Sequence, residues 1–389
     1  MAAFDRVDSV RRLKQAFVEF SAESKQGGAA VSLWQENQCL LSLHSGEASP
    51  GSPWTAETPC LIWSASKGVA AAVTLHALQG KGIGLGTPVA DFWPEFAQNG
   101  KAAITLAELL SHRAGLAAIQ QQGLLINDHE RVAAVLASQA PNWTPDGSHG
   151  YGARTFGFLL DEIVRRISGM PLAGYWNQVF RESLELDLWF GLPEEKISTA
   201  ALVIAPKSPP APSDFSRAFG DPASLTRRAL SEPGGFLTPS IMNTPEMRST
   251  SIPSLGAIAT ADALARFYAL LAAPSTFFTE STRALMQTTL SRGIDRTLLE
   301  ETSFSAGFMS NATGVYGPNP LSHHGHTPSH HGHTPCAFGH PGAGGSVGFA
   351  DPENKIGFAF IPSAMHPGAL PGRRTQKLIR ALYGLDHSE

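Results

Sequence analysis

The sequence has few of the features that mark several large classes of protein. It contains three cysteines among 389 residues, Cys39, Cys60 and Cys336, and none of them sits in a C-x-x-C pair. Three dispersed cysteines do not make a disulfide scaffold, so we expect each thiol to act as a small apolar group. This pattern suits a reducing compartment, and we predict a cytoplasmic protein.

Long apolar runs and concentrated positive charge are also missing. No stretch reaches the roughly 20 consecutive apolar residues that span a bilayer, and residues 1–20 lack the continuous apolar core of a signal peptide. The formal net charge is −4, and Lys and Arg are scattered, so no basic stripe is available for nucleic-acid phosphates. We expect a soluble protein without a membrane or nucleic-acid partner; the oligomeric state stays open.

What the sequence does contain is an ordinary globular composition, with 42% hydrophobic and 16% charged residues. Strand patterns lie near both ends of the chain, at residues 29–34, 39–43, 345–350 and 355–361. Helical patterns flank these strands or fill the middle of the chain, at residues 10–20, 75–85, 105–110, 129–140, 155–167 and 373–382. The pattern predicts an α+β fold: one antiparallel sheet built from both chain ends, flanked by helices, with an inserted helical domain.

The boundaries follow from this order of elements. Residues 1–75 and 240–389 are predicted to form the sheet domain, and residues 76–239 a mainly helical domain, because single cores rarely exceed roughly 250–300 residues. Residues 205–239, rich in Pro, Ser and Gly, are predicted to be a long surface loop. Residues 322–335 contain the heptapeptide Ser-His-His-Gly-His-Thr-Pro twice. Metal binding there is an alternative to a solvated loop, which we favour because no cysteine or carboxylate completes a site.

One short motif carries a specific chemical hypothesis. Of nine lysines, only Lys67 has a serine three positions earlier, Ser64. A short apolar run precedes Ser64, and a helical pattern ending at Gly80 follows it, so both side chains share one face of a helix. In the first turn, free backbone N–H groups and the helix dipole favour a developing oxyanion.

The chemistry requires a base beside the hydroxyl. A serine hydroxyl is a poor nucleophile until its proton is removed, and a neutral lysine amine can remove it where burial or a nearby cation lowers the lysine pKa. Lys67 lies in an otherwise apolar helix, so it either extends to solvent or serves chemistry. The S-x-x-K pattern alone is common and needs further support.

Later segments supply that support. The chain resembles the serine β-lactamase and penicillin-binding superfamily, and most closely its family VIII carboxylesterases. After the S-x-x-K motif, the resemblance rests on these segments, in order: Gly80–Val89, Trp93–Phe96, Ile104–Leu116, Pro145–Gly147 with Tyr151 and the residues to Gly169, Leu255–Leu271 and His340–Phe349. It covers most of residues 29–385.

The resemblance implies roles for further residues. Tyr151 would lie across the site from Lys67, as the acid that protonates the leaving group or as the base in deacylation. The main-chain amides of Ser64 and Ala343 would form the oxyanion hole. No metal ion and no organic cofactor is implied.

Two departures from the superfamily pattern bear on the substrate. The Lys-Thr-Gly motif is replaced by His340-Pro341-Gly342, and Tyr-x-Asn is replaced by Tyr151-Gly152-Ala153. Ala153 has no side-chain amide to bind a substrate amide, and His340 is not a permanent cation for a substrate carboxylate. His340 would orient the substrate or tune Lys67 and Tyr151, with a purely structural role as the alternative, while the small Gly342 would let substrate lie against the backbone. Both changes favour neutral or small esters.

Rival nucleophiles and bases are less consistent with the sequence. Ser346 lies in a Gly-x-Ser-x-Gly string, yet it falls in a predicted strand, and fewer than 45 residues follow it to supply an acid and a histidine. We predict a structural role for Ser346. His112 and Asp91 suggest a triad with Ser64, but the resemblance places His112 at a helix end, and we predict a core or capping role for it.

These observations predict a serine carboxylesterase that acts on small-molecule esters through an acyl-enzyme, in a groove between the two domains. An acyl-transfer variant would use the same residues. A β-lactamase or D-aminoacyl peptidase is the alternative among enzymes, and a non-catalytic scaffold of the same fold is the alternative outside them. The acyl and alcohol preferences stay open.

Overall fold

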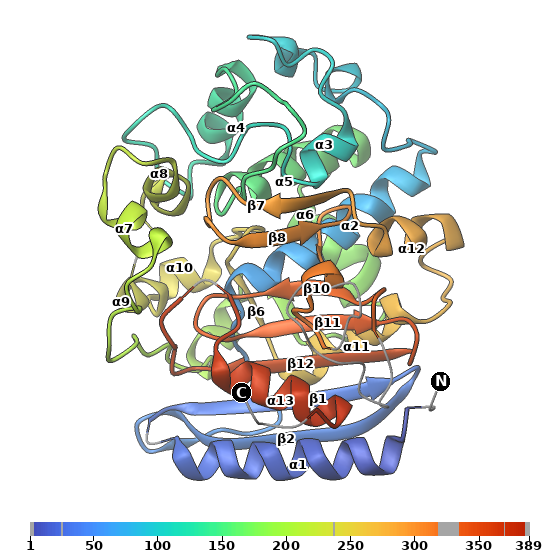
Figure 1. Ribbon diagram of the computed structural model, residues 1–389, viewed down its shortest axis with the longest axis vertical. Coiled ribbons are helices and arrows are strands. Elements are labelled where there is room, and N and C mark those ends of the chain that lie inside the picture. The colour runs from blue at the N-terminus through green and yellow to red at the C-terminus, as the bar shows by residue number, and fades with distance from the viewer. Residues whose placement is uncertain (1–3, 25, 236–237, 318–333, 369, 386–389) are drawn as a thin grey trace.

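The computed structural model describes residues 4–24, 26–235, 238–317, 334–368 and 370–385. Its centre is a nine-stranded antiparallel sheet with the order β3-β2-β1-β12-β11-β10-β9-β8-β7 (Figure 1). Strand β1 (Gly28–Gln35) pairs with β2 (Gln38–Ser49) on one side and with β12 (Ile356–Pro362) on the other. The first and last long strands of the chain are therefore neighbours, which confirms the predicted sheet built from both chain ends.

The remaining strands complete this sheet and form a small second one. They are β3 (Ser52–Pro53), β4 (Cys60–Leu61), β5 (Leu188–Phe190), β6 (Ala257–Ala259), β7 (Ser291–Ile294), β8 (Glu301–Phe304), β9 (Met309–Ser310), β10 (Phe338–Pro341) and β11 (Val347–Asp351). The second sheet has the order β4-β6-β5. It places the segment that precedes Ser64 beside β6.

Helices cover both faces of the large sheet. The N-terminal helix α1 (Arg6–Glu23) and the C-terminal helix α13 (Arg373–Tyr383) pack together on one face, and α11 (Ala261–Ala272) packs on β1, β11 and β12 from the other. The approach of α11 is so close that a Cβ at Gly357 would lie 2.1 Å from main-chain atoms of Ala265 and Ala269. Because both faces are covered, β1 is buried from Gly28 to Leu33, a run in which Ser32 is the one hydroxyl-bearing residue.

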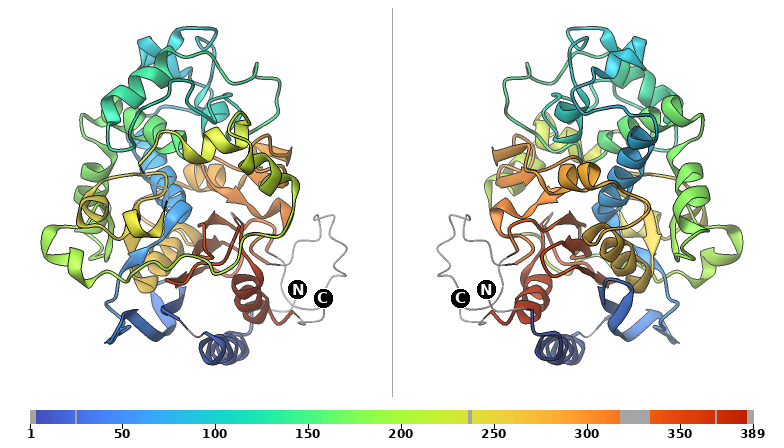
Figure 2. Two further views of the ribbon diagram at one scale, coloured as in Figure 1. Left: turned by 90° about the vertical axis from the view of Figure 1, so that its left-hand side faces the viewer. Right: turned by 90° about the vertical axis from the view of Figure 1, so that its right-hand side faces the viewer.

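The other helices lie mainly between the two halves of the sheet sequence. They are α2 (Ser66–Gly80), α3 (Leu106–Leu110), α4 (His129–Ser138), α5 (Thr155–Ser168), α6 (Leu172–Trp176), α7 (Asp214–Gly220), α8 (Leu225–Ser231), α9 (Pro239–Met242), α10 (Pro245–Ser249) and α12 (Glu280–Gln287). Figures 1 and 2 show α3 and α4 at one end of the molecule and α1 at the opposite end. Helix α2 packs against α5 and against β10, so it joins the helical region to the sheet.

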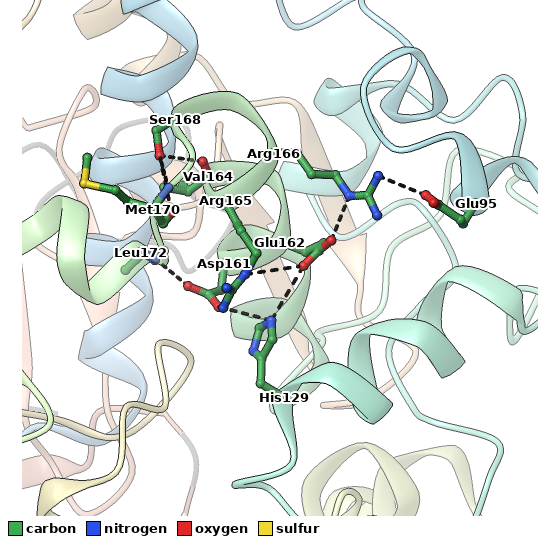
Figure 3. A network of polar contacts seen from close by, with 10 residues as sticks. All are labelled: Glu95, His129, Asp161, Glu162, Val164, Arg165, Arg166, Ser168, Met170 and Leu172. Atoms are coloured by element: carbon green, nitrogen blue, oxygen red, sulfur yellow. Dashed lines mark hydrogen bonds and ion pairs between the residues drawn. The ribbon is translucent and has the colours of Figure 1, made fainter.

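A network of polar contacts ties the helical region together (Figure 3). His129 Nε2 at the start of α4 lies 3.1 Å from Asp161 Oδ2 on α5. Arg166, one turn further along α5, contacts Glu162 at 2.7 Å and Glu95 at 2.9 Å. Partly exposed ion pairs contribute little stability each, so we interpret this network as fixing the orientation of α4 and α5.

The structure corrects the prediction for residues 205–239. Two helices, α7 and α8, lie within the predicted loop, and serine caps begin both of them. Ser213 Oγ accepts a hydrogen bond from the N–H of Ser216 at 3.1 Å, and Ser224 Oγ accepts one from the N–H of Arg227 at 3.0 Å. Such caps satisfy N–H groups that a helix start leaves unpaired, which is why short helices form in a Pro- and Ser-rich segment.

Other predictions fall outside the described residues or stay untested. The histidine repeat at 322–335 lies outside the described residues except for Thr334 and Pro335, so metal binding there stays open. Within the described ranges, no cluster of three or more His, Cys, Asp or Glu residues could hold a metal ion. No helix among the described residues is long and apolar enough to cross a bilayer. The division into domains at 75/76 and 239/240 stays a prediction.

Candidate active site

Ser64 lies at a sharp turn where the small sheet meets α2. It sits in the short 3₁₀ turn Trp63–Ala65, between β4 and α2. Trp63 adopts φ 51°, in the left-handed region that costs a non-glycine residue free energy. Ser66 holds this turn, because its hydroxyl donates to the carbonyl of Trp63 and accepts from the N–H of Ala257 at 3.0 Å. Ser64 itself is partly exposed.

Ser346, the rival nucleophile in the sequence, makes a structural contact with the segment that precedes Ser64. It is buried directly before β11, and its hydroxyl donates to the carbonyl of Ile62 at 2.7 Å. Ile62 lies two residues before Ser64, so Ser346 anchors the nucleophile segment to the large sheet. This contact supports the predicted structural role.

Lys67 is fully buried beneath Ser64 and makes three polar contacts. Its Nζ lies 3.3 Å from Ser64 Oγ, 2.7 Å from the carbonyl oxygen of Ala153 and 2.7 Å from that of Ser254. A carbonyl oxygen only accepts hydrogen bonds, so these two contacts use two N–H groups of the amine. An uncharged amine then has its lone pair left for the Ser64 hydroxyl proton, which is the arrangement that a base requires.

Burial and a neighbouring cation favour that uncharged amine. Burial lowers the pKa of Lys67 well below its ordinary value, and the positive charge of Arg154 lowers it further. The guanidinium of Arg154 is itself buried and donates to the carbonyls of Leu230 at 2.7 Å and Pro233 at 2.6 Å. Burial lowers the Arg154 pKa to about 10, so it stays positive at neutral pH. The sequence analysis expected burial or a nearby cation to lower the Lys67 pKa, and the structure contains both.

Tyr151 lies directly against Lys67 and Ser64. Its ring centroid is 4.8 Å from Lys67 Nζ, and its phenol hydrogen-bonds with the side chain of Ser64. Burial raises the Tyr151 pKa above its ordinary value, and the negative charge of Asp295 raises it further, although the Ser64 contact opposes the shift. The phenol therefore stays protonated, which suits a group that gives a proton to a leaving group.

His112 marks the end of α3 and contacts the Tyr151 loop. It has φ 59°, and its N–H donates to the carbonyl of Leu109 at 3.2 Å. Its Nδ1 accepts the N–H of Gly152 at 3.2 Å, so the neutral ring carries its proton on Nε2, which has no hydrogen-bond partner among the described residues. Asp91 is exposed in the 3₁₀ turn Val89–Asp91. A triad of Ser64, His112 and Asp91 has no support in this arrangement.

His340 is buried in β10 and stacks on Tyr151, with ring centroids 5.7 Å apart. Its Nδ1 lies 2.7 Å from the carbonyl of Pro341, so Nδ1 carries a proton and donates it. Burial and the proximity of Lys67 lower the His340 pKa to about 3, against the effect of the Pro341 carbonyl. His340 is therefore uncharged at neutral pH, and β10 offers no permanent cation at this position.

The end of β10 lies against the segment before Ser64. A Cβ at Gly342 would lie 2.2 Å from Ser346 Oγ and 2.3 Å from the carbonyl oxygen of Ile62, so only glycine fits there. Ala343 follows and is partly exposed, as Ser64 is. Ala153, predicted to face substrate, is buried, and its carbonyl binds Lys67.

Three contributors to the site were missed by the sequence reasoning. Ser254 supplies a carbonyl to Lys67, Arg154 supplies a cation, and Asp295 accepts hydrogen bonds from the Tyr151 N–H. The sequence carries no signal for Ser254, because a main-chain carbonyl can come from any residue. Arg154 lies three positions after Tyr151, but its burial became visible only in the fold.

The fold and the grouping of Ser64, Lys67 and Tyr151 define a serine hydrolase with a β-lactamase fold. The model of the beta-lactamase family matches residues 13–382, and the chain belongs to that family.

Individual relatives extend this comparison. The esterase/beta-lactamase LipL of Mycobacterium tuberculosis (strain ATCC 25618 / H37Rv) is 29% identical over 369 residues, which cover 89% of this chain and 79% of LipL. A penicillin-binding protein homolog from Caulobacter crescentus matches with TM-score 0.85 and 29% identity over 97% of both chains. A family VIII carboxylesterase matches with TM-score 0.82 and 27% identity, again over 97% of both chains. Proteins named as esterases are thus among its similar relatives.

Proposed function

We propose that this protein hydrolyses small neutral carboxylic esters through an acyl-enzyme on Ser64. The observation that carries the proposal is the contact set of Lys67, whose two N–H bonds to carbonyls leave a lone pair for the Ser64 hydroxyl. Burial and Arg154 both favour the uncharged amine that such a base needs.

The proposed course uses only side chains and amides of this chain. Ser64 Oγ bonds to the ester carbonyl carbon as its proton passes to Lys67, and the amides of Ser64 and Ala343 hold the oxyanion. The carbon–oxygen bond to the alcohol then breaks, and the leaving oxygen takes a proton from Tyr151, which regains one from Lys67. Water adds to the acyl-enzyme in the same manner and releases the acid. An alcohol in place of water would give acyl transfer.

The charges around Ser64 support neutral substrates. His340 is uncharged, and the guanidinium of Arg154 donates to the carbonyls of Leu230 and Pro233. A substrate carboxylate would therefore lack a permanent cation, and Ala153 offers no side-chain amide for a lactam or peptide amide. The name of the family VIII carboxylesterase supports an ester substrate, and the name of the esterase/beta-lactamase LipL supports both an ester and a lactam. The likeness to a penicillin-binding protein homolog keeps a lactamase or amidase as the second candidate.

The first test is the nucleophile. We expect Ser64→Ala to abolish p-nitrophenyl butyrate hydrolysis and labelling by a fluorophosphonate probe, with little change in thermal unfolding, because Ser64 is partly exposed. Ser346→Ala is the matched control and should keep the label. An unlabelled wild type would indicate a scaffold, and a label retained by Ser64→Ala but lost in Ser346→Ala would move the nucleophile.

The second test is the substrate class. Esters of increasing acyl length are compared with nitrocefin and a D-amino acid amide at the same concentration of fluorophosphonate-titrated sites. We expect the largest kcat/KM for a neutral ester. Faster turnover of nitrocefin would replace the esterase proposal with the lactamase.

A further inference from the structure

The loop that carries Tyr151 has no helix or strand of its own, yet three successive main-chain N–H groups in it are bound from outside. The N–H of Gly150 donates to the carbonyl of His112 at 3.0 Å. The N–H of Tyr151 donates to both carboxylate oxygens of Asp295, each at 3.1 Å. The N–H of Gly152 donates to His112 Nδ1 at 3.2 Å. Two residues, His112 and Asp295, therefore hold the whole turn.

Asp295 is built into the structure as an acceptor. It lies directly after β7, is fully buried, and also accepts from the N–H groups of Thr297 at 2.7 Å and Leu298 at 2.9 Å and from the hydroxyl of Thr302 at 3.2 Å. A buried carboxylate with this many donors is held in one position, and so is the N–H of Tyr151 that it binds. His149 Nε2 lies 3.7 Å from Asp295, so the residue two positions before Tyr151 faces the same carboxylate.

His112 completes the arrangement from the other side of the site. Its ring lies 5.2 Å from the Tyr151 ring, centroid to centroid, at an interplanar angle of 63°. The neutral ring can accept the Gly152 N–H only while Nδ1 is unprotonated, and burial lowers the His112 pKa well below its ordinary value, with smaller contributions from Lys67, His340 and His149. At neutral pH the Nδ1 of His112 is thus an acceptor.

We propose that Asp295 and His112 are positioning residues that fix the phenol of Tyr151 where it protonates the leaving alcohol. This inference rests on the proposed ester hydrolysis and adds a role for two residues that bind the main chain of the Tyr151 loop. A catalytic group misplaced by about 1 Å can lower the rate as much as 10²-fold. Because Asp295 and His112 bind the main chain of the Tyr151 loop, they determine where the phenol lies.

The proposal makes a specific claim about leaving groups. An alkyl alcohol is a poor leaving group and needs a proton as the carbon–oxygen bond breaks, whereas p-nitrophenolate leaves without one. Loosening the Tyr151 loop should therefore slow ethyl butyrate much more than p-nitrophenyl butyrate. A general loss of structure would slow both esters equally.

The experiment uses Asp295→Asn, which keeps the size of the side chain and replaces one acceptor oxygen by a donor. We expect kcat/KM, which reports acylation, to fall about 100-fold for ethyl butyrate and less than about fivefold for p-nitrophenyl butyrate, since acid–base groups contribute 10²–10⁴-fold. Deacylation does not enter this comparison, because both esters form the same butyryl-enzyme. Rates are divided by the number of sites that a fluorophosphonate probe titrates, so unfolded protein does not count.

Asp351→Asn is the matched control. Asp351 is also fully buried and caps a turn, accepting from the N–H groups of Glu353 at 3.0 Å and Asn354 at 3.3 Å, but it is the last residue of β11. Asp351→Asn should leave the ratio of the rates for the two esters unchanged even if the protein becomes less stable. If the ratio of the two ester rates is unchanged in Asp295→Asn, whether both rates fall equally or neither falls, the proposal is overturned.

A second pair of variants keeps the test decisive if Asp295→Asn does not fold. His112→Asn retains an oxygen that can accept the Gly152 N–H, and His112→Leu does not. We expect the ester ratio to change in His112→Leu and to recover in part in His112→Asn; the same ratio in both would count against the proposal. Failure of the proposed function looks different, because wild type itself would then neither take the label nor cleave either ester.

Discussion

Two buried lysines in this molecule have nearly the same surroundings and, by our account, different roles. Lys67 and Lys101 are both inaccessible to solvent, and both donate to two main-chain carbonyls. Both also lie over an aromatic ring: Lys67 Nζ is 4.8 Å from the Tyr151 centroid and Lys101 Nζ is 5.4 Å from that of Phe96. A buried amine with paired carbonyls is therefore not by itself the mark of a catalytic site.

The difference lies in the third partner and in the nearby charge. Lys67 contacts the partly exposed hydroxyl of Ser64, whereas the contacts of Lys101 among the described residues are the carbonyls of Gln98 and Gln139 and the Phe96 ring. Burial lowers the pKa of both lysines, but only Lys67 has the added effect of Arg154 and is shifted well below its ordinary value. Lys101 joins two segments of the helical region; Lys67 is placed to take a proton.

The largest expected effect comes from exchanging each lysine for methionine. Lys67→Met should lower kcat/KM for p-nitrophenyl butyrate about 10³-fold, because it removes the base. Lys101→Met should change kcat/KM less than about twofold while costing about 1–3 kcal/mol of unfolding free energy, since two buried carbonyls lose their donor. Kinetics and chemical denaturation of both variants measure the two quantities.

Equal activity losses in the two methionine variants would break the comparison, because a shared structural role would then explain both. Circular dichroism melts serve as the control that each variant is folded at the assay temperature.

A smaller effect should separate two buried arginines. Arg154 lowers the pKa of Lys67, so Arg154→Met should raise it and move the acidic limb of the pH profile of kcat/KM to higher pH. Arg154→Lys keeps the charge and should move this limb less. Arg248→Met is the matched control, because Arg248 is also buried and donates to the carbonyls of Ile197 and Ala201.

The control is that a fluorophosphonate probe labels as many sites in Arg154→Met as in wild type. If the acidic limb then stays in place, Arg154 does not help to keep Lys67 uncharged. A limb that moves equally in Arg248→Met would show a general response to the loss of a buried arginine.

The smallest effect is on the pH dependence of stability. The folded-state pKa of Lys67 lies below its ordinary value of 10.5, so between the two values the unfolded chain holds a proton that the folded chain does not. The free energy of unfolding therefore rises with pH across that window, by about 1.4 kcal/mol in total for each unit of pKa shift. The unfolding free energy of Lys67→Met minus that of wild type should therefore fall as pH rises toward 10.5, measured by urea unfolding.

Lys101 gives the comparison in the same series. Its pKa is lowered by burial alone, so Lys101→Met should show a shallower pH dependence than Lys67→Met. A flat difference between Lys67→Met and wild type from pH 7 to 10 would mean that the amine is not shifted on folding.

The parts of the site that the sequence predicted are local or belong to one motif. Ser64 and Lys67 lie within one helical turn, so their contact follows from spacing alone, and the resemblance supplied Tyr151 and His340. The sheet from both chain ends followed from short strand patterns near both termini, although the caps at Ser213 and Ser224 were overlooked within a loop-like composition.

The parts that were not predicted depend on contacts between distant segments. The carbonyl of Ser254 is 187 positions from Lys67, and Asp295 is 144 positions from Tyr151. A main-chain acceptor leaves no trace in a sequence, and a lone aspartate after a strand resembles any turn residue. In the same way, nothing in the sequence distinguishes Lys101 as a second buried lysine, because burial is decided by packing.

The most direct test of the account is the titration of Lys67 itself, by NMR of protein labelled with ¹³C at the ε-carbon of lysine. The Lys67→Met variant assigns the Lys67 resonance among nine lysines, and Lys101→Met assigns its counterpart. We predict that the Lys67 resonance reports an uncharged amine at pH 8, with a midpoint well below 10.5 and below that of Lys101. An ammonium signal for Lys67 that persists to pH 10 would contradict the claim that this lysine is the base for Ser64.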